Sequence, residues 1–208
     1  LSVVKYFLKF KFIASIHGVK SNNKIFNYAD YVIGGNKNIL NEIQSPNSVI
    51  HNWYRSSSVE KHKSIHALAV GRLEKVKGFD LLIKSWINIK TPLLIVGSGK
   101  EKESLVALIK ELNLSNKISI TNWVEQEELF KLYAQSNVLI ISSKSEGGPR
   151  VALEALANNL PVLSTDVGHM NLILPQEILA EPDNLESLQS LMESYVDNII
   201  NLNQESIF

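Results

Sequence analysis

Hydrophobic and polar positions follow two alternating patterns along most of the chain: short apolar runs and stretches with helical spacing. From residue 64 onward, the apolar runs predict five strands and the stretches between them predict helices. The predicted strands are Ile65–Val70, Leu93–Val96, Lys117–Ile120, Asn137–Ile141 and Pro161–Ser164. The predicted helices are Lys77–Ile89, Lys100–Leu112, Glu125–Ser136, Val151–Leu160 and Leu185–Ile200. Because parallel strands need a crossover and a helix provides it, we expect an α/β domain with a doubly wound, Rossmann-like parallel sheet.

The first 52 residues carry a shorter series of the same kind. Strands are expected at Phe12–Ile16, Asp30–Ile33 and Ser48–Ile50, and short helices at Asn23–Ala29 and Asn36–Ile43. Residues 53–63, WYRSSSVEKHK, lack apolar periodicity and are interpreted as a linker. The expected organisation is therefore an incomplete α/β domain over 1–52, a linker over 53–63 and a second α/β domain over 64–208.

Composition and charge narrow the class of protein. The chain is 45% hydrophobic and 20% charged with a formal net charge of zero, which is typical of a globular protein and not of a general nucleic-acid binder. The absence of cysteine excludes disulfides and thiol chemistry. Five scattered histidines show no metal-ligand spacing, and no apolar run reaches the roughly 18 residues of a membrane span. Lysines interrupt the apolar segment Leu1–Ser15, which favours a helix running into a strand over a signal peptide.

The segment SEGGPRVALEALANNLPV, Ser145–Val162, follows the predicted strand Asn137–Ile141 and predicts a glycine turn and an exposed helix N-terminus. Gly147 and Gly148 allow backbone conformations closed to other residues, and Pro149 suits the first position of a helix. Unpaired amides and the positive end of the helix dipole attract phosphate or another anion. The segment therefore predicts an anion site at the start of the helix.

Two carboxylates flank this helix start, Glu146 in the turn and Glu154 in the second helical turn. A carboxylate accepts hydrogen bonds from neighbouring hydroxyls, as on a sugar or a ribose, so both could hold one elongated ligand. A plainer alternative is that Glu154 pairs with Arg150 at i,i+4 on a solvent-facing helix.

The order of these residues resembles the signature of the family-4 retaining glycosyltransferases of GT-B fold, the "glycosyl transferases group 1" type. The resemblance rests on Glu-Gly-Gly-Pro at 146–149, the second carboxylate at 154, and the Ala-Leu-Ala and Leu-Pro-Val that follow. It implies that Glu146 holds the hydroxyls of the donor sugar, that Glu154 holds the nucleotide ribose, and that the amides from Gly148 to Val151 face the diphosphate. Asn159 stands where the family usually has glycine, and asparagine tolerates left-handed backbone better than most residues.

A second group of candidates follows the first predicted strand of the second domain. Gly71, Arg72, Lys75 and Lys77 lie in a strand-end loop, where cations can neutralise a diphosphate. The alternative is a set of surface cations, one of them paired with Glu74, and we favour it for Lys75. Arg72 and Lys77 match the family's G-R-L and K-G pattern, in which they hold the donor phosphates.

Three further strand ends carry candidates. Gly97 and Gly99 form a G-x-G turn without the third glycine of a dinucleotide fingerprint. Trp123 and Val124 follow a strand, and the family contacts the nucleotide base there. His17 ends a strand of the first domain, and the resemblance implies contact with the transferred sugar. We interpret Asp166, Gly168 and His169, in the turn after the next strand, as structural residues or as residues that support the site without touching the ligand.

Taken together, the resemblance implies a hexosyltransferase that uses a nucleotide-sugar, with UDP-sugar favoured, and a glycan or lipid-linked acceptor. Without an Asp-x-Asp motif we expect no metal or other cofactor, and Arg72 with Lys77 would take the cation's place. The residues expected to act in catalysis are Glu146, Arg72, Lys77 and His17. The residues expected to bind the donor are Gly71, Arg72, Lys77, Trp123, Val124, Glu146, Gly147, Gly148, Arg150, Val151 and Glu154.

Other functions fit the same pattern. A nucleotide-sugar-binding module without activity of its own is one, because two complete α/β domains need nearly twice this length, and a complementary chain could then supply the missing part. A nucleotide-sugar epimerase of GT-B fold is another, although the spacing of Glu146 and Glu154 fits family 4 better. The expected location is the cytoplasm, with the lysines of the first segment compatible with contact to the inner face of the membrane.

Overall fold

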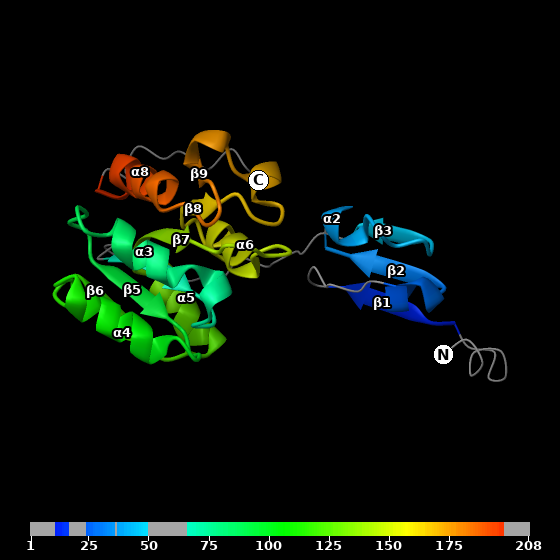
Figure 1. Ribbon diagram of the computed structural model, residues 1–208, viewed down its shortest axis with the longest axis horizontal. Coiled ribbons are helices and arrows are strands. Elements are labelled where there is room, and N and C mark those ends of the chain that lie inside the picture. Colours follow the sequence, from blue (N-terminus) through cyan, green and yellow to red (C-terminus); the bar gives the residue numbers. More distant parts are fainter. Residues whose placement is uncertain (1–10, 17–23, 36, 50–65, 198–208) are drawn as a thin grey trace. The chain divides into compact units, whose positions relative to one another are not determined.

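The computed structural model describes residues 11–16, 24–35, 37–49 and 66–197. The chain forms two compact units, one that contains Leu1–Trp53 together with Glu146–Gly148 and one that contains Tyr54–Ser145 and Pro149–Phe208 (Figure 1). The predicted linker and His17 lie outside the described residues. No helix among the described residues has both the length and the apolar character needed to cross a bilayer.

The first unit contains a three-stranded parallel sheet in the order β1-β2-β3. Its elements are β1 (Ile13–Ile16), the 3-10 helix η1 (Lys24–Tyr28), β2 (Tyr31–Gly34), α2 (Lys37–Leu40) and β3 (Asn47–Val49). Ala14, Ile16 and Val32 are buried against Leu40 and Ile43, so alternate strand residues form a small core. The helix predicted over Asn36–Ile43 is only the single turn of α2.

The second unit is built on a six-stranded sheet in which every pairing is parallel, in the order β6-β5-β4-β7-β8-β9. The strands are β4 (His66–Val70), β5 (Leu93–Val96), β6 (Ile118–Thr121), β7 (Ser136–Ile141), β8 (Val162–Thr165) and β9 (Leu179–Ala180). The five predicted strands are confirmed. The sixth was missed because β9 has only two residues, too few to show a pattern.

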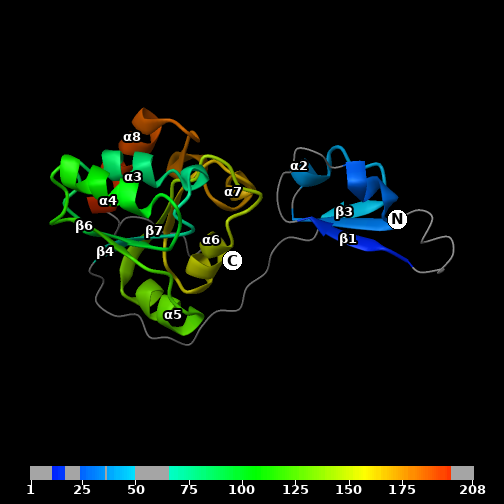
Figure 2. The ribbon, with the colours of Figure 1, turned by 60° about the horizontal axis from the view of Figure 1, so that its bottom comes forward.

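Helices cover both faces of this sheet, with α3, α4 and α8 on one face and α5 and α6 on the other (Figure 2). They are α3 (Phe79–Ser85), α4 (Lys102–Glu111), α5 (Gln126–Ala134), α6 (Arg150–Ala157), α7 (Met170–Ile173) and α8 (Leu185–Tyr195), with the 3-10 helices η2 (Lys75–Lys77) and η3 (Gln176–Ile178). The helix predicted from Lys77 to Ile89 was wrong at both ends. Gly78 is left-handed, with φ 63°, so α3 begins after it and Lys77 lies in η2.

The core lies between the sheet and these helices. All five residues of β4 are buried, as a central parallel strand covered on both faces requires. Ala152 and Ala155 of α6 are fully buried, and their small side chains let the helix approach the sheet closely. Trp86, at the end of α3, is also buried and donates its indole N–H to the Thr91 carbonyl at 2.8 Å. Packing therefore fixes α3 and α6, the two helices that follow β4 and β7.

A carboxylate beyond the end of α8 ties that helix to the loop between α3 and β5. Asp197 accepts the Thr91 N–H at 3.0 Å, the Thr91 hydroxyl at 2.8 Å and the Lys90 N–H at 3.1 Å. Burial tends to raise the pKa of Asp197, but these hydrogen bonds outweigh it and hold the pKa below its usual value.

Replacing Asp197 with asparagine is expected to lower the free energy of unfolding by about 1 kcal/mol at pH 7, the typical net worth of such a hydrogen-bonded group. The pKa of Asp197 is lower in the folded state, so the carboxylate stabilises the folded protein fully at pH values above its unfolded pKa of about 3.9. This stabilisation is lost as the pH falls through the folded pKa. Urea denaturation of both proteins between pH 7 and pH 3 measures this. If the difference in unfolding free energy between the two proteins stayed constant from pH 7 to pH 3, the stabilisation could not come from the charged carboxylate of Asp197.

Candidate functional site

The order of the strands places two loops at one point of the sheet edge. The chain proceeds from β4 through β5 to β6 in one direction, and then returns to β7 on the other side of β4. The order therefore reverses between β4 and β7, and ligands of open parallel sheets bind outside the carboxyl ends of strands at such a point. The loop after β4 carries Arg72 and Lys77, and the loop after β7 leads through Glu146 into α6.

The loop after β4 rests on the G-x-G turn that follows β5. Leu73 donates its N–H to the Ser98 carbonyl at 2.9 Å, and Glu101 donates to the Leu73 carbonyl at 3.0 Å. A Cβ on Gly97 would lie 1.9 Å from the Gly71 carbonyl oxygen, and one on Gly99 would lie 2.3 Å from the Leu73 carbonyl oxygen. The two glycines therefore allow two backbones to touch, which confirms a structural turn here.

The loop after β7 binds the loop after β4 directly. Lys144 donates its N–H to the Val76 carbonyl at 2.8 Å, and the Ser142 hydroxyl donates to the Lys77 carbonyl at 2.9 Å. A Cβ on Gly78 would lie 2.1 Å from the Ser142 carbonyl oxygen. The backbone of Lys77 is thus held against the segment that leads to Glu146.

Lys144 also joins this contact to two other elements. Its ammonium lies 2.7 Å from Asp183, just before α8, and 3.9 Å from Asp80 in the first turn of α3. The hydrogen bond to Asp183, assisted by both negative charges, raises the pKa of Lys144 against the opposing effect of burial. Lys144 therefore stays charged at neutral pH and braces the loop after β7.

The two predicted phosphate ligands differ in their surroundings. Arg72 donates to Glu74 at 2.7 Å, so the expected pairing of Glu74 with one cation of the loop occurs at Arg72. With the Arg72 side chain 69% exposed, such a pair contributes about 0–1 kcal/mol, so a phosphate can displace the carboxylate. The stem of Lys77 runs past Gly71, where an added Cβ would lie 3.5 Å from Lys77 Cδ and Cε.

The start of α6 differs in detail from the prediction. Pro149 is the N-cap, with φ −70° and ψ 108°, and the helix begins at Arg150. Pro149 was therefore wrongly expected at the first helical position. Gly147 and Gly148 are not among the positive-φ glycines of the described chain, which are Gly78, Gly99 and Gly168. Pro149 itself makes no side-chain capping bond, Arg150 is exposed, and Val151 is partly buried against the core.

Glu154 is half-buried on α6 and accepts a hydrogen bond from the Tyr133 hydroxyl of α5 at 3.1 Å. The ion pair between Glu154 and Arg150, which was the plainer alternative, is not found among the described residues. Asn159, just after α6, has φ 55°, a left-handed conformation that asparagine tolerates better than most residues.

Trp123 and Val124 follow β6 at the same edge of the sheet, beyond β5. The Trp123 side chain is 56% exposed, and its backbone N–H bonds the Ser98 hydroxyl at 3.2 Å. Val124 packs against the core. The G-x-G turn therefore supports both the cationic loop and the segment predicted to meet the nucleotide base.

Sequence reasoning did not find several residues that hold these loops. They are Tyr133, Ser142, Lys144 and Thr165. The Thr165 hydroxyl donates to the Ser143 carbonyl at 2.7 Å. Each of the four contacts a residue far away in the sequence, so no local sequence pattern identifies it. Gly168, with φ 63°, and the buried His169 lie in the turn after β8, as expected of structural residues.

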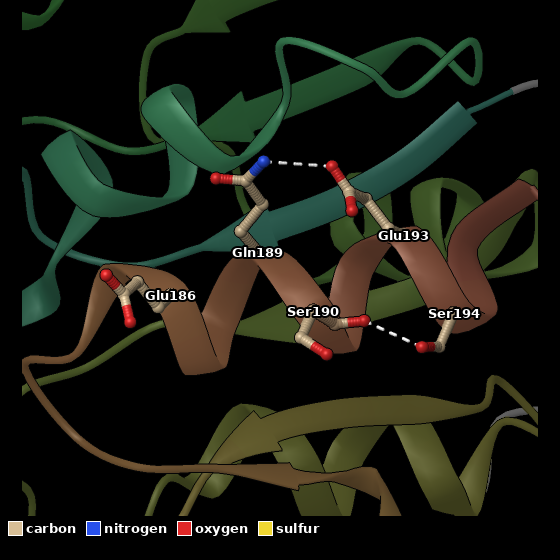
Figure 3. A pocket seen from close by; sticks show the side chains of 5 residues that line it. All are labelled: Glu186, Gln189, Ser190, Glu193 and Ser194. Atoms are coloured by element: carbon tan, nitrogen blue, oxygen red, sulfur yellow. Dashed lines mark hydrogen bonds between the residues drawn. The ribbon is translucent and has the colours of Figure 1, made fainter.

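Two surface pockets are lined by described residues of this unit. One of about 360 Å³ is lined by Glu74, Lys75, Phe79, Asp80, Glu101, Ser104, Leu105 and Lys144. The other runs along α8, where Gln189 donates to Glu193 and Ser194 to the Ser190 carbonyl (Figure 3). None of the residues predicted to bind the donor lines either pocket. Within the described ranges, no group of three or more His, Asp or Glu side chains is placed to hold a metal ion.

Comparison with known families and sequences is consistent with this geometry. Residues 52–205 match the family model described as "Glycosyl transferases group 1". The chain is 37% identical over 127 residues to the N-acetylgalactosamine-N,N'-diacetylbacillosaminyl-diphospho-undecaprenol 4-alpha-N-acetylgalactosaminyltransferase of Campylobacter jejuni, covering 58% of this chain and 34% of that protein. It is 29% identical over 153 residues to the O-antigen chain mannosyltransferase of Salmonella typhimurium, which covers 71% of this chain and 43% of that protein. The chain thus spans less than half the length of these relatives.

Among solved structures, Anabaena HepE in complex with UDP and glucose superposes with a TM-score of 0.84 at 15% identity. The match covers 96% of this chain and 65% of that one. At this identity the likeness shows the shared fold, an α/β architecture with Rossmann-like parallel sheets.

Proposed function

The chain belongs to the group 1 glycosyl transferases, and from this membership we propose that it binds a nucleotide-sugar and transfers the hexose with retention to a glycan or lipid-linked acceptor. The observation that carries the proposal is the joining of two loops at the point where the strand order reverses. Ser142 and Gly78 hold the Lys77 backbone against the segment that leads to Glu146 and α6. A preorganised cationic edge of this kind suits a nucleoside diphosphate.

The proposed roles follow from the chemistry of each group. Negative charge grows on the diphosphate as the bond to the sugar breaks, and Arg72 and Lys77 stabilise it without a metal. The amides at the start of α6, at the positive end of the helix dipole, add to this. Glu154 accepts the ribose hydroxyls, and Glu146 orients the hexose, so that the departing phosphate can take the proton of the attacking hydroxyl on the same face. For His17, which lies outside the described residues, the proposed role of contacting the transferred sugar rests on the family resemblance alone.

The proposed donor is a UDP-hexose, with GDP-mannose second. The solved relative from Anabaena is a complex with UDP and glucose, which supports a uridine donor. The names of the curated relatives, an O-antigen chain mannosyltransferase and a transferase acting on a diphospho-undecaprenol-linked sugar, support a role in surface polysaccharide assembly. We place the reaction in the cytoplasm, at the inner face of the membrane where a lipid-linked acceptor is held.

Calorimetric titration of this chain with UDP, GDP and ADP, without divalent metal, tests the proposal. One diphosphate is expected to bind, and Glu154→Ala is expected to weaken that binding by about ten- to a hundredfold, because two hydroxyl contacts to a charged group are lost. Glu111→Ala, which removes an exposed carboxylate at the end of α4, is the matched control and should bind as the unchanged chain does.

Two outcomes count against the proposal. If none of the three diphosphates binds to the folded chain, the donor site is not formed by these residues, and a module without activity becomes the better interpretation. If the Glu154→Ala and Glu111→Ala variants bind equally well, a diphosphate site exists but Glu154 does not hold the ribose.

A further inference from the structure

Tyr133 and Glu154 join two helices that cover the same face of the sheet. Tyr133 lies on α5 with no exposed surface, and its hydroxyl donates to Glu154 Oε2 of α6 at 3.1 Å. The two residues are 21 positions apart. The contact therefore depends on the packing of α5 beside α6, and it brings a buried phenol to a carboxylate on the helix that begins at the candidate site.

The ring and the hydroxyl of Tyr133 make separate contacts. The ring packs in the core beside Phe130, with the two ring centroids 6.5 Å apart and the planes tilted by 40°. This packing already anchors the side chain, since an aromatic residue contributes mainly through its buried area. The hydroxyl extends from this anchor to a half-buried carboxylate, which is itself able to meet a ligand.

The hydrogen bond restricts the carboxylate. A glutamate on a helix surface samples several rotamers, and ordering it on binding costs affinity. Tyr133 occupies a lone pair of Oε2, so Glu154 keeps one orientation before a ligand arrives. A carboxylate has about four lone-pair sites, so Oε1 and the remaining site on Oε2 can still accept two hydroxyls.

We propose that Tyr133 is the positioning residue for Glu154, holding its carboxylate so that it accepts the two vicinal ribose hydroxyls of a nucleoside diphosphate. This inference rests on the proposed function, because it assumes that Glu154 meets the ribose. It adds a residue from a different helix to the donor site, one that touches no substrate and acts through Glu154.

Tyr133→Phe removes one oxygen and keeps the buried ring. The probes are UDP and 2′,3′-dideoxy-UDP, or the corresponding guanosine or adenosine pair if that base is the one bound. We expect the variant to bind the ribose form about three- to tenfold more weakly and the dideoxy form as well as before, so the preference for ribose hydroxyls shrinks by the same factor. Glu154→Ala should abolish the preference, and adding Tyr133→Phe to it should change nothing further.

Tyr195→Phe is the matched control, because it removes the same oxygen from a partly buried tyrosine of α8. Thermal unfolding of all variants reports on folding. A purely structural Tyr133 would weaken both ligands by one factor, and an unchanged preference in Tyr133→Phe would overturn this inference while leaving the proposed function in place. Failure of the unchanged chain to bind any nucleoside diphosphate would remove the proposed function and this inference with it.

Discussion

Replacing Gly78 with alanine is expected to destabilise the second unit by about 3 kcal/mol. Gly78 is left-handed, with φ 63°, which costs other residues roughly 1–2 kcal/mol. The added methyl would also lie 2.1 Å from the Ser142 carbonyl oxygen, so one of the two backbones must move. Such a movement separates the loops that meet between β4 and β7, and we expect diphosphate binding to be lost with it.

Gly71→Ala is the matched control for this substitution. It lies in the same loop, but an added Cβ there makes only ordinary contacts of 3.4 Å with Phe79 and 3.5 Å with Lys77. Chemical denaturation of both variants, followed by circular dichroism, measures the difference. Equal stability of the two variants would show that the contact between Gly78 and Ser142 is not a tight one.

Replacing Lys77 with alanine is expected to weaken the binding of the nucleoside diphosphate by about ten- to a hundredfold. Hydrogen bonds between charged groups contribute about 1.5–3 kcal/mol, and Lys77 is held at the edge of the sheet by the bond from Ser142 to its carbonyl. Because that bond uses only the backbone carbonyl of Lys77, the alanine variant should keep the fold of the loop.

Lys75→Ala separates the charge of Lys77 from the general charge of the loop. Both lysines belong to η2, and Lys75 is the one interpreted as a surface cation. Calorimetry at two salt concentrations gives the comparison, since a loss that comes only from long-range attraction fades as salt rises. Comparable losses in the two variants would mean that Lys77 has no specific contact with the phosphates.

These variants bear on how the site is assembled, because no single element contains it. The loop that carries Arg72 and Lys77 connects β4 to α3. It is supported by the turn after β5 and contacts the loop after β7. Lys144 then connects that loop to α3 and to the start of α8. A substitution in any of these loops can therefore affect a site to which it contributes no ligand.

Much of this was predictable from local pattern. The alternation of apolar runs and amphipathic stretches predicted the five longer strands of the second unit and the helices between them. The stretch at 137–162 predicted a strand followed by a helix, and Asn159 was identified as a residue that tolerates the left-handed backbone it adopts. Such features depend on which face of each element is buried, and that burial appears in the local sequence as the spacing of apolar residues.

Some predictions were wrong for equally local reasons. The helix expected from Lys77 begins at Phe79, because Gly78 takes a conformation that no helix interior contains. Pro149 lies one position before α6 as its N-cap, a difference that spacing alone cannot resolve. The two residues of β9 carry too little pattern to be separated from a loop.

The order of the strands, the meeting of the loops and the partners of the site residues were decided by the tertiary structure. Ser142 meets Lys77 across 65 positions, Asp197 meets Thr91 across 106, and Tyr133 meets Glu154 across 21. Apolar periodicity indicates that a strand is buried. It does not indicate which other strand lies beside that strand, because the pattern is the same for any neighbour. The sequence by itself therefore determined the elements and the residues predicted to bind a nucleotide-sugar. Only packing, which acts between residues far apart in the chain, decided which residues hold the loops of the site together.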